Sequence, residues 1–276
     1  MKLKLKQYAC LLILLVLWAA SAQATEYTAI QGNVVSVEAV LGKTSPSLSC
    51  FGRTWPVKSL GRHRWRGWIG VDLKKKPGKY AIRWRQGKRL LARDTLNIRK
   101  GNFRISRISV KKSMAVFNKK KLQRILREVK ALKAAYRVTV DANPDIVMHF
   151  FPAKGVESTP FGARRYVNGE PRSPHTGIDI AAPVGTPVRL PLAGRVLMVA
   201  DMYLNGKTIA IGHGNGLVSV YSHMQSTDVR KGQWVKTGAT IGVVGATGRT
   251  TGPNLHWGVR FYNARVNPAS ILEQVR

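Results

Sequence analysis

The region from about Pro160 to Arg276 restricts the fold more than any other part of the sequence. It is rich in glycine and β-branched residues, and turn-forming residues recur about every eight to twelve positions. Short segments typical of strands lie between these turns, at residues 188–190, 195–199, 208–212, 218–222, 240–244 and 256–261. Because no long helical pattern interrupts them, we expect an all-β, largely antiparallel domain over residues 160–276.

Residues 25–100 also carry strand and turn signals. Apolar and polar residues alternate at 35–39 and at 80–85, which is the two-residue period of a half-buried strand. Pro77-Gly78 and Gln86-Gly87 lie where hairpin turns would fall. These signals predict a small N-terminal β domain of the sandwich type, and hence a mainly β protein.

Between the two β regions the period changes to the three- and four-residue steps of a helix. The residues of its apolar stripe are Leu122, Ile125, Leu126, Val129, Leu132 and Tyr136. Asn118 is a suitable N-cap. We expect this helix to connect the two β domains, within a linker of residues 101–159, and to pack between them.

Residues 1–24 have the three parts of a secretory signal peptide. Lys2, Lys4 and Lys6 precede an apolar run, and Ala22-Gln23-Ala24 offers a cleavage site of the small-x-small type. The apolar run is shorter than the roughly 20 residues that a membrane-spanning helix needs. We therefore expect an exported protein of the periplasm or cell envelope, and a retained N-terminal anchor is the alternative.

The charge of the chain points to an anionic partner. Lysine and arginine number 46 and the acidic residues 13, which gives a formal net charge of +33. Export argues against nucleic acid, so we expect no nucleic-acid partner and instead attraction to anionic envelope polymers or lipid headgroups.

Removal of the signal would leave Cys50 as the one cysteine, so an intramolecular disulfide is excluded and a buried position is expected.

Histidine and aspartate gather in the C-terminal region in a pattern typical of metal sites. His175 precedes a predicted strand that contains Asp179, and Asn254 and His256 share one face of another strand. Two histidines and one aspartate suit Zn²⁺, and three protein ligands leave a fourth position for water, as in catalytic zinc sites. Zinc lowers the pKa of such a water to roughly 7. The sequence therefore predicts a catalytic zinc site.

Four spaced motifs in this region resemble the lysostaphin-type zinc metallopeptidases, which cut peptide bridges of bacterial cell walls. The motifs are SPHTGIDIAAPVGTP at 173–187, GHGNGL at 212–217, YSHM at 221–224 and GATGRTTGPNLHWGV at 245–259. The resemblance spans residues 161–268. The preceding β region and helix resemble, more weakly, the N-terminal regions of some Gram-negative members.

The resemblance implies roles for five residues. His175, Asp179 and His256 match the zinc ligands, and His223 matches a catalytic histidine that contacts the attacking water or the tetrahedral oxyanion. Asn254 departs from the family pattern, which has histidine there. Asparagine can hold a water but cannot carry a proton at neutral pH, and loss of an acid–base group typically costs about 10²–10⁴ in rate.

Two functions follow from the resemblance. The first is a zinc endopeptidase that hydrolyses the peptide cross-links of peptidoglycan, with Asn254 positioning water. The alternative is a catalytically weakened relative that binds peptidoglycan or regulates another cell-wall hydrolase. We expect His213 to be a structural hydrogen-bonding residue, and Asn168-Gly169 to form a hairpin turn at the rim of the site.

Overall fold

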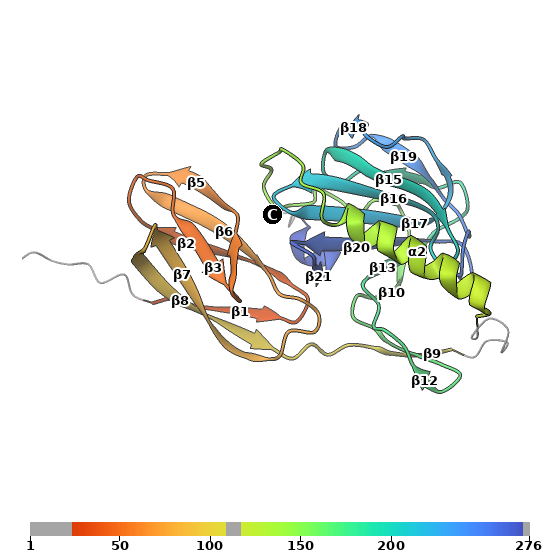
Figure 1. Ribbon diagram of the computed structural model, residues 1–276, viewed down its shortest axis with the longest axis horizontal. Coiled ribbons are helices and arrows are strands. Elements are labelled where there is room, and N and C mark those ends of the chain that lie inside the picture. Colours follow the sequence, from red (N-terminus) through yellow and green to blue (C-terminus); the bar gives the residue numbers. More distant parts are fainter. Residues whose placement is uncertain (1–23, 109–116, 273–276) are drawn as a thin grey trace, which may run out of the picture.

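A computed structural model of the protein describes residues 24–108 and 117–272. The predicted signal peptide lies outside the described residues, except for Ala24. Within the described part of the chain, no helix combines the length and apolar character needed to cross a bilayer. The protein is mainly β, which confirms the predicted fold class, and Figure 1 shows the N-terminal strands on the left and the C-terminal strands on the right.

The N-terminal β unit consists of two sheets packed face to face. One sheet has the order β1-β8-β7-β3-β4 and the other β2-β6-β5. The strands are β1 (Glu26–Ile30), β2 (Val34–Val40), β3 (Ser47–Cys50), β4 (Arg53–Trp55), β5 (Val57–Gly61), β6 (Arg64–Gly70), β7 (Gly78–Gln86) and β8 (Arg89–Arg99). A Cβ atom at Gly67 of β6 would lie 2.1 Å from the Leu48 side chain of β3, so the two sheets approach closely. This arrangement is sandwich-like, as the sequence predicted.

The alternation along β7 sets the core of this sandwich. Ile82 and Trp84 are fully buried, whereas Arg83 and Arg85 keep contact with solvent. The indole N–H of Trp84 donates to Asp94 Oδ2 at 3.0 Å, so this buried polar group is paired. Cys50 is buried as predicted, and burial raises the pKa of its thiol to about 11, which makes it a poor nucleophile.

The C-terminal β unit contains one large sheet in which the described pairs are antiparallel. Its main order is β10-β13-β20-β17-β16-β15-β18, and β14 joins through β19. The strands are β10 (Val156–Thr159), β13 (Gly177–Ala181), β14 (Pro187–Arg189), β15 (Gly194–Met202), β16 (Gly206–Gly214), β17 (Leu217–Thr227), β18 (Trp234–Val235), β19 (Thr240–Val244), β20 (Asn254–Phe261) and β21 (Ala264–Val266), followed by the short helix η1 (Pro268–Ile271). The six strands that the sequence predicts between residues 188 and 261 all lie in this sheet.

A small sheet stands beside the large one. It contains β9 (Ile105–Ile108), β11 (Arg164–Val167) and β12 (Glu170–Pro171), with β9 parallel to β11. Asn168 and Gly169, both with positive φ (53° and 83°), form the two-residue turn between β11 and β12. The predicted hairpin is therefore present, and the segment expected to be a linker contributes one of its neighbouring strands.

Helix α2 (Lys119–Ala135) begins where the sequence predicted, because the side chain of Asn118 accepts a hydrogen bond from the Lys121 amide at 2.9 Å. The expectation that it packs between the two β units is wrong. The helix lies on the face of the C-terminal sheet (Figure 1), where Ala135 contacts an apolar cluster of β15, β16 and β17. Leu122 and Leu126, which belong to the predicted stripe, are exposed.

The two β units contact each other directly near the end of β20. The ring of Trp55 lies 5.3 Å from that of Phe261, between centroids. The backbone and side-chain nitrogens of Arg265 both donate to Asp72 Oδ2 at 2.9 Å, and the Asn267 amide donates to the Gly32 carbonyl at 2.6 Å. One continuous apolar core runs through both units. The two β units thus contact each other without the helix between them.

Candidate metal centre

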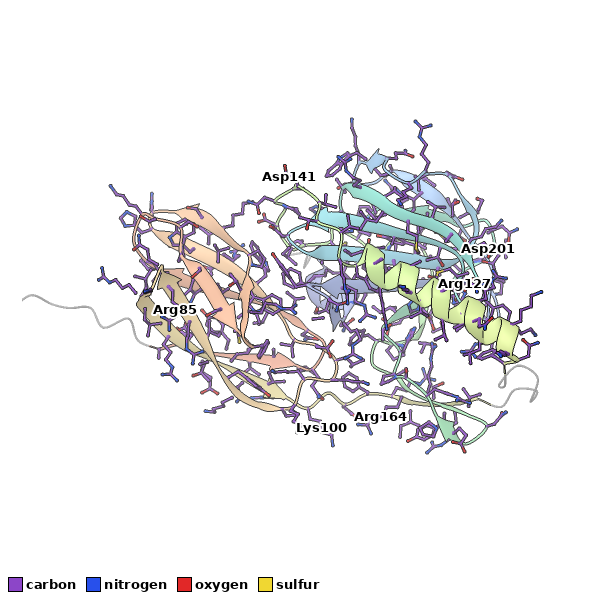
Figure 2. The ribbon with its side chains drawn as sticks, viewed as in Figure 1. Arg85, Lys100, Arg127, Asp141, Arg164 and Asp201 are labelled. Atoms are coloured by element: carbon purple, nitrogen blue, oxygen red, sulfur yellow. The ribbon has the colours of Figure 1, made fainter. Side chains whose placement is uncertain are left out.

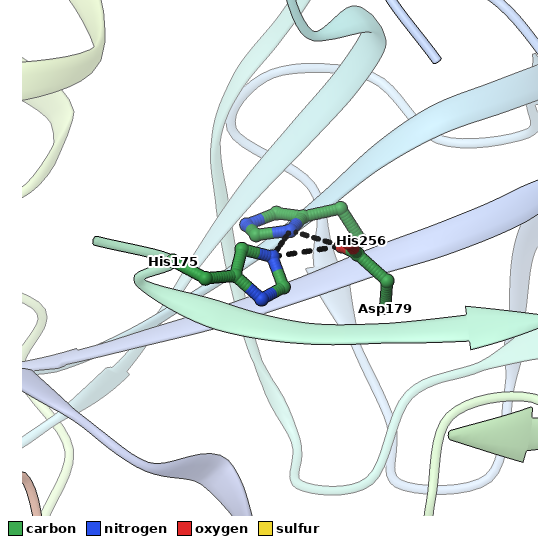
Figure 3. A group of neighbouring side chains, drawn as sticks. All are labelled: His175, Asp179 and His256. Carbon is green, nitrogen blue, oxygen red and sulfur yellow. Dashed lines mark hydrogen bonds and ion pairs between the residues drawn. The ribbon is translucent and has the colours of Figure 1, made fainter. Parts of the chain in front are cut away.

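Strands β13 and β20 bring three predicted ligands together on one face of the large sheet. Asp179 of β13 lies directly opposite His256 of β20, and His175 lies two residues before β13. Figure 3 shows their side chains converging. His175 Nε2 lies 2.9 Å from both His256 Nδ1 and Asp179 Oδ1, and His256 Nδ1 lies 2.7 Å from Asp179 Oδ1. The opposite face of β13 carries Ile178 and Ile180, both buried, so the core holds these strands in place.

Two outer atoms of this cluster, one on His175 and one on Asp179, have a partner that orients them. His175 Nδ1 lies 3.0 Å from the Pro160 carbonyl, and the Arg165 guanidinium donates to Asp179 Oδ2 at 2.9 Å. Because a carbonyl only accepts, His175 Nδ1 carries the hydrogen and Nε2 offers its lone pair to the cluster. The carboxylate is likewise turned so that Oδ1 is free for the cluster. Such outer contacts are typical of metal ligands.

The electrostatics of the cluster favour the protonation states in which Asp179 and His256 can bind a metal ion. Burial alone would raise the pKa of Asp179, but hydrogen bonds with His175 and His256 hold that pKa far below its usual range. Burial lowers the pKa of His256, with partial opposition from Asp179. At neutral pH the cluster therefore offers one carboxylate and a neutral imidazole at His256, the forms that bind metals.

The geometry fits a small tetrahedral cation. Zinc bonds to nitrogen and oxygen are about 2.0–2.1 Å long, so two ligand atoms of a tetrahedron lie roughly 3.3 Å apart. The three donor atoms, at 2.7–2.9 Å from one another, need to separate by only about half an ångström to reach that spacing. The donor set of two imidazoles and one carboxylate suits zinc, so the three residues form a candidate metal site.

His223 of β17 reaches the same face through an irregularity of the strand. Tyr221 and Met224 point into the buried core, and strict alternation would send His223 there as well. A bulge lies between the pairs Tyr221–Ile209 and Met224–Lys207, and His223 itself has a φ of 65°. Bulges re-aim side chains in this way. The His223 ring consequently lies 6.3 Å from the His256 ring, between centroids.

The hydrogen bonds of His223 define its free nitrogen. Its Nδ1 lies 2.8 Å from the Thr247 carbonyl, so Nδ1 carries the hydrogen and Nε2 is left as an acceptor. Burial lowers the pKa of His223, the Thr247 bond opposes this, and His256 adds repulsion. A neutral imidazole next to the ligand cluster is thus available at physiological pH.

Asn254, the position that departs from the family pattern, shares the face of His256 as its strand period predicted. Its amide nitrogen donates to Thr250 Oγ1 and, at 2.8 Å, to the Gly252 carbonyl. Its Oδ1 is buried and has no hydrogen-bond partner among the described residues. An unpaired buried acceptor needs a donor such as a water O–H.

The remaining histidine of the matched region has a structural position. His213 is buried, with Nδ1 2.9 Å from the Ala193 carbonyl and Nε2 2.7 Å from Ser219 Oγ. Burial lowers its pKa to about 4. The prediction that His213 is a hydrogen-bonding residue of the core is confirmed, and it takes no part in the cluster.

The cluster and its neighbours line a pocket of about 760 Å³. Residues of β9 and β11, with Arg172 directly after β12, line one part of it, and His223, Asn254 and the three candidate ligands line another. None of the described residues of the N-terminal sandwich lines it. Three arginines on the wall, Arg165, Arg172 and Arg249, were not predicted from the sequence, because nothing in a basic chain distinguishes them from the other arginines.

Known proteins share this domain. The model of the family described as Peptidase family M23 matches residues 173–268. The DD-carboxypeptidase/endopeptidase Mpg of Neisseria meningitidis is 40% identical over 114 residues, which are 41% of this chain and 26% of that protein. The peptidoglycan DD-endopeptidase ShyA of Vibrio cholerae is 44% identical over 85 residues, 31% of this chain and 20% of that protein. The chain thus spans about a quarter or less of the length of these relatives.

A solved structure resembles nearly the whole chain. It is the crystal structure of a Pseudomonas aeruginosa protein assigned to peptidase M23, which is 32% identical to this chain. The likeness covers 88% of this chain and 94% of that one, with a TM-score of 0.69. A likeness of this extent takes in most of the N-terminal sandwich as well as the domain that carries the motifs. The chain therefore belongs to peptidase family M23.

Proposed function

We propose that the protein is a zinc-dependent endopeptidase that hydrolyses the peptide cross-links of bacterial peptidoglycan. The observation that carries the proposal is the convergence of His175 Nε2, Asp179 Oδ1 and His256 Nδ1 at 2.7–2.9 Å on the floor of a large pocket. Of the two relatives named above, ShyA is a peptidoglycan DD-endopeptidase by name and Mpg a DD-carboxypeptidase/endopeptidase by name, which supports peptidoglycan as the substrate. The metal-ligand assignments and the substrate are parts of this proposal.

Zinc held by these three residues would supply a Lewis acid for the scissile carbonyl and lower the pKa of a bound water. His223 is the group that takes a proton or a hydrogen bond, because its Nε2 is a free acceptor and its pKa is lowered. Asn254 orients a water through its unpaired Oδ1. Arg165 holds Asp179 in the orientation that presents Oδ1.

The strong positive charge fits an envelope location. Figure 2 shows side chains such as Arg85, Lys100 and Arg127 projecting from separate elements, so the charge is spread over the surface. We propose that the protein is exported and that this surface attracts anionic envelope polymers or lipid headgroups.

Digestion of purified sacculi tests the function. The wild-type protein should bind about one Zn²⁺ per chain and raise the share of uncrosslinked muropeptides that a muramidase then releases from the sacculi, detected by mass spectrometry, and a chelator should stop this rise. Asp179→Ala should lose both the metal and the activity. Asp201→Ala is the matched control, because Asp201 is exposed on β15 (Figure 2) and should change neither. If the zinc-loaded wild type cuts no cross-links, the alternative of a peptidoglycan-binding regulator is favoured. The observation behind that alternative is Asn254, which stands where the family pattern has a histidine.

A further inference from the structure

Three cations line the wall of the pocket that holds the metal cluster. Arg165 and Arg172 come from the hairpin of β11 and β12, and Arg249 comes from the segment between β19 and β20. Their two segments are separate in sequence, so the pocket brings the charges together by folding. A pocket of about 760 Å³ falls within the roughly 300–1,000 Å³ of sites that take small ligands.

The pocket has little negative charge to balance these cations. Asp179 is the one carboxylate among the described residues that line it, and it is already bonded to His175, His256 and Arg165. Arg165 is therefore neutralised, whereas Arg172 and Arg249 have no ion pair with any described residue. A metal in the cluster would add further positive charge.

Arg249 shares the pocket lining with Arg165 and Arg172, and their charges act on it. The pKa of Arg249 is lowered by burial and then by the charges of Arg165 and Arg172. Its guanidinium stacks over the Phe117 ring at 5.8 Å, and its amide bonds to the Leu204 carbonyl at 2.9 Å. Arg249 is thus held in place beside other cations, an arrangement that costs free energy unless an anion joins it.

We infer that Arg172 and Arg249 bind a free carboxylate of the substrate peptide next to the scissile amide. This inference rests on the proposed function. The cations share one pocket with the metal cluster, so a peptide whose amide reaches the cluster brings its neighbouring groups to these cations. The anionic group of a peptide is a carboxylate, and the planar guanidinium matches it with two parallel hydrogen bonds.

The substrate class that follows is a cross-linked peptide with a carboxylate beside the cleaved bond. A peptide in which this carboxylate is a carboxamide keeps its shape but loses the charge. The arginines would then keep one neutral carbonyl acceptor but lose the charge and the second acceptor oxygen, so the protein should discriminate against the amidated peptide. Charge-assisted hydrogen bonds are stronger than neutral ones, so the discrimination should reach about tenfold or more in KM.

Paired substrates test the inference with the full chain. Purified cross-linked muropeptides in the acid and amidated forms are digested by the zinc-loaded wild type, Arg172→Gln and Arg249→Gln. Each variant should raise KM for the acid form about tenfold, change kcat less, and raise KM for the amidated form by a clearly smaller factor. Arg164→Gln is the matched control, since Arg164 is exposed on the same small sheet (Figure 2) and does not line the pocket.

The outcomes separate this inference from the proposed function. Equal cleavage of both forms by the wild type, or an equal effect of the arginine variants on both, would overturn the inference and leave the endopeptidase proposal standing. Cleavage of neither form would reject the proposed function. Calorimetric binding of the two peptides to Asp179→Ala protein then decides the inference: tighter binding of the acid form, lost with Arg249→Gln, supports it, and equal binding rejects it.

Discussion

Replacement of Asn254 distinguishes a working enzyme from a weakened one. Asn254 stands where the family has a histidine, and its amide nitrogen is fully used by Thr250 and Gly252. Only Oδ1 is left to act on a water, and it can do so only by accepting a hydrogen bond. We expect Asn254 to orient the water, while His223 supplies the proton-accepting nitrogen.

The size of the effect follows from this single bond. A neutral hydrogen bond contributes about 0.5–1.5 kcal/mol, which corresponds to roughly a two- to tenfold change in rate. Asn254→Ala should therefore lower the rate of muropeptide release about two- to tenfold at unchanged zinc content. Asn254→His should change the rate by a similarly small factor, because His223 already provides the basic nitrogen.

The competing idea gives a different magnitude. If the reaction requires a proton carrier at position 254, the wild type should be nearly silent, and Asn254→His should raise the rate by roughly 10²–10⁴. Rates are measured on sacculi by mass spectrometry, and thermal unfolding and zinc content of each variant are the controls. If the zinc-loaded wild type is inactive and Asn254→His restores activity, the proposed role of Asn254 in orienting water is refuted. That result would favour the alternative function, a catalytically weakened relative that regulates another cell-wall hydrolase.

Three further predictions concern stability, metal binding and adsorption. The pKa of His213 is about 4 in the folded protein against 6.5 for a free histidine, so its contribution to stability is complete above pH 6.5 and is lost as the pH falls toward 4, a loss of about 3 kcal/mol. In urea unfolding at pH 7.5 and 4, the wild type should lose about that much more free energy of unfolding than His213→Gln; an equal loss would reject the assignment. Arg165→Gln should weaken zinc binding about 10- to 100-fold in chelator competition, because the variant loses the contact that orients Asp179. This loss outweighs the removal of the repulsion between the Arg165 charge and the zinc ion, which solvent partly screens. An unchanged zinc affinity would contradict this prediction. Binding of Asp179→Ala protein to sacculi should weaken as salt rises, since exposed charges are screened within about 8 Å at physiological ionic strength, and salt-independent binding would assign the basic surface another role.

The sequence predicts those features of the site that depend on local rules. Strand periodicity alone places Asn254 and His256 on one face, and it separates Asp179 from the buried Ile178 and Ile180. The N-cap at Asn118 and the turn at Asn168-Gly169 follow from local backbone chemistry in the same way. These predictions succeed because the interactions that decide them lie within a few residues.

Features that depend on tertiary contacts are not readable from the same patterns. Strict alternation would bury His223 beside Tyr221, and only the bulge opposite Lys207 turns its ring to the site. The apolar stripe of α2 predicts a buried face but not which sheet covers it, and Leu122 and Leu126 stay exposed. The three pocket arginines come from two distant segments, so their proximity is visible only in the folded chain.

The packing of the N-terminal sandwich argues against its acting as a lid over the pocket. Its contacts with the C-terminal unit bury Trp55 against Phe261 and include the paired charges of Asp72 and Arg265. Swinging the sandwich across the site would return these aromatic surfaces to water and break that ion pair, a change comparable to opening a hydrophobic core. Part of the pocket lining is instead supplied by β9 and the β11–β12 hairpin, from the segment that precedes the residues matched by the family model. The choice among cell-wall peptides should therefore depend on the sequence of this small sheet. Exchanging the β11–β12 hairpin between two relatives should exchange the peptide that each prefers, while the zinc content of both stays unchanged.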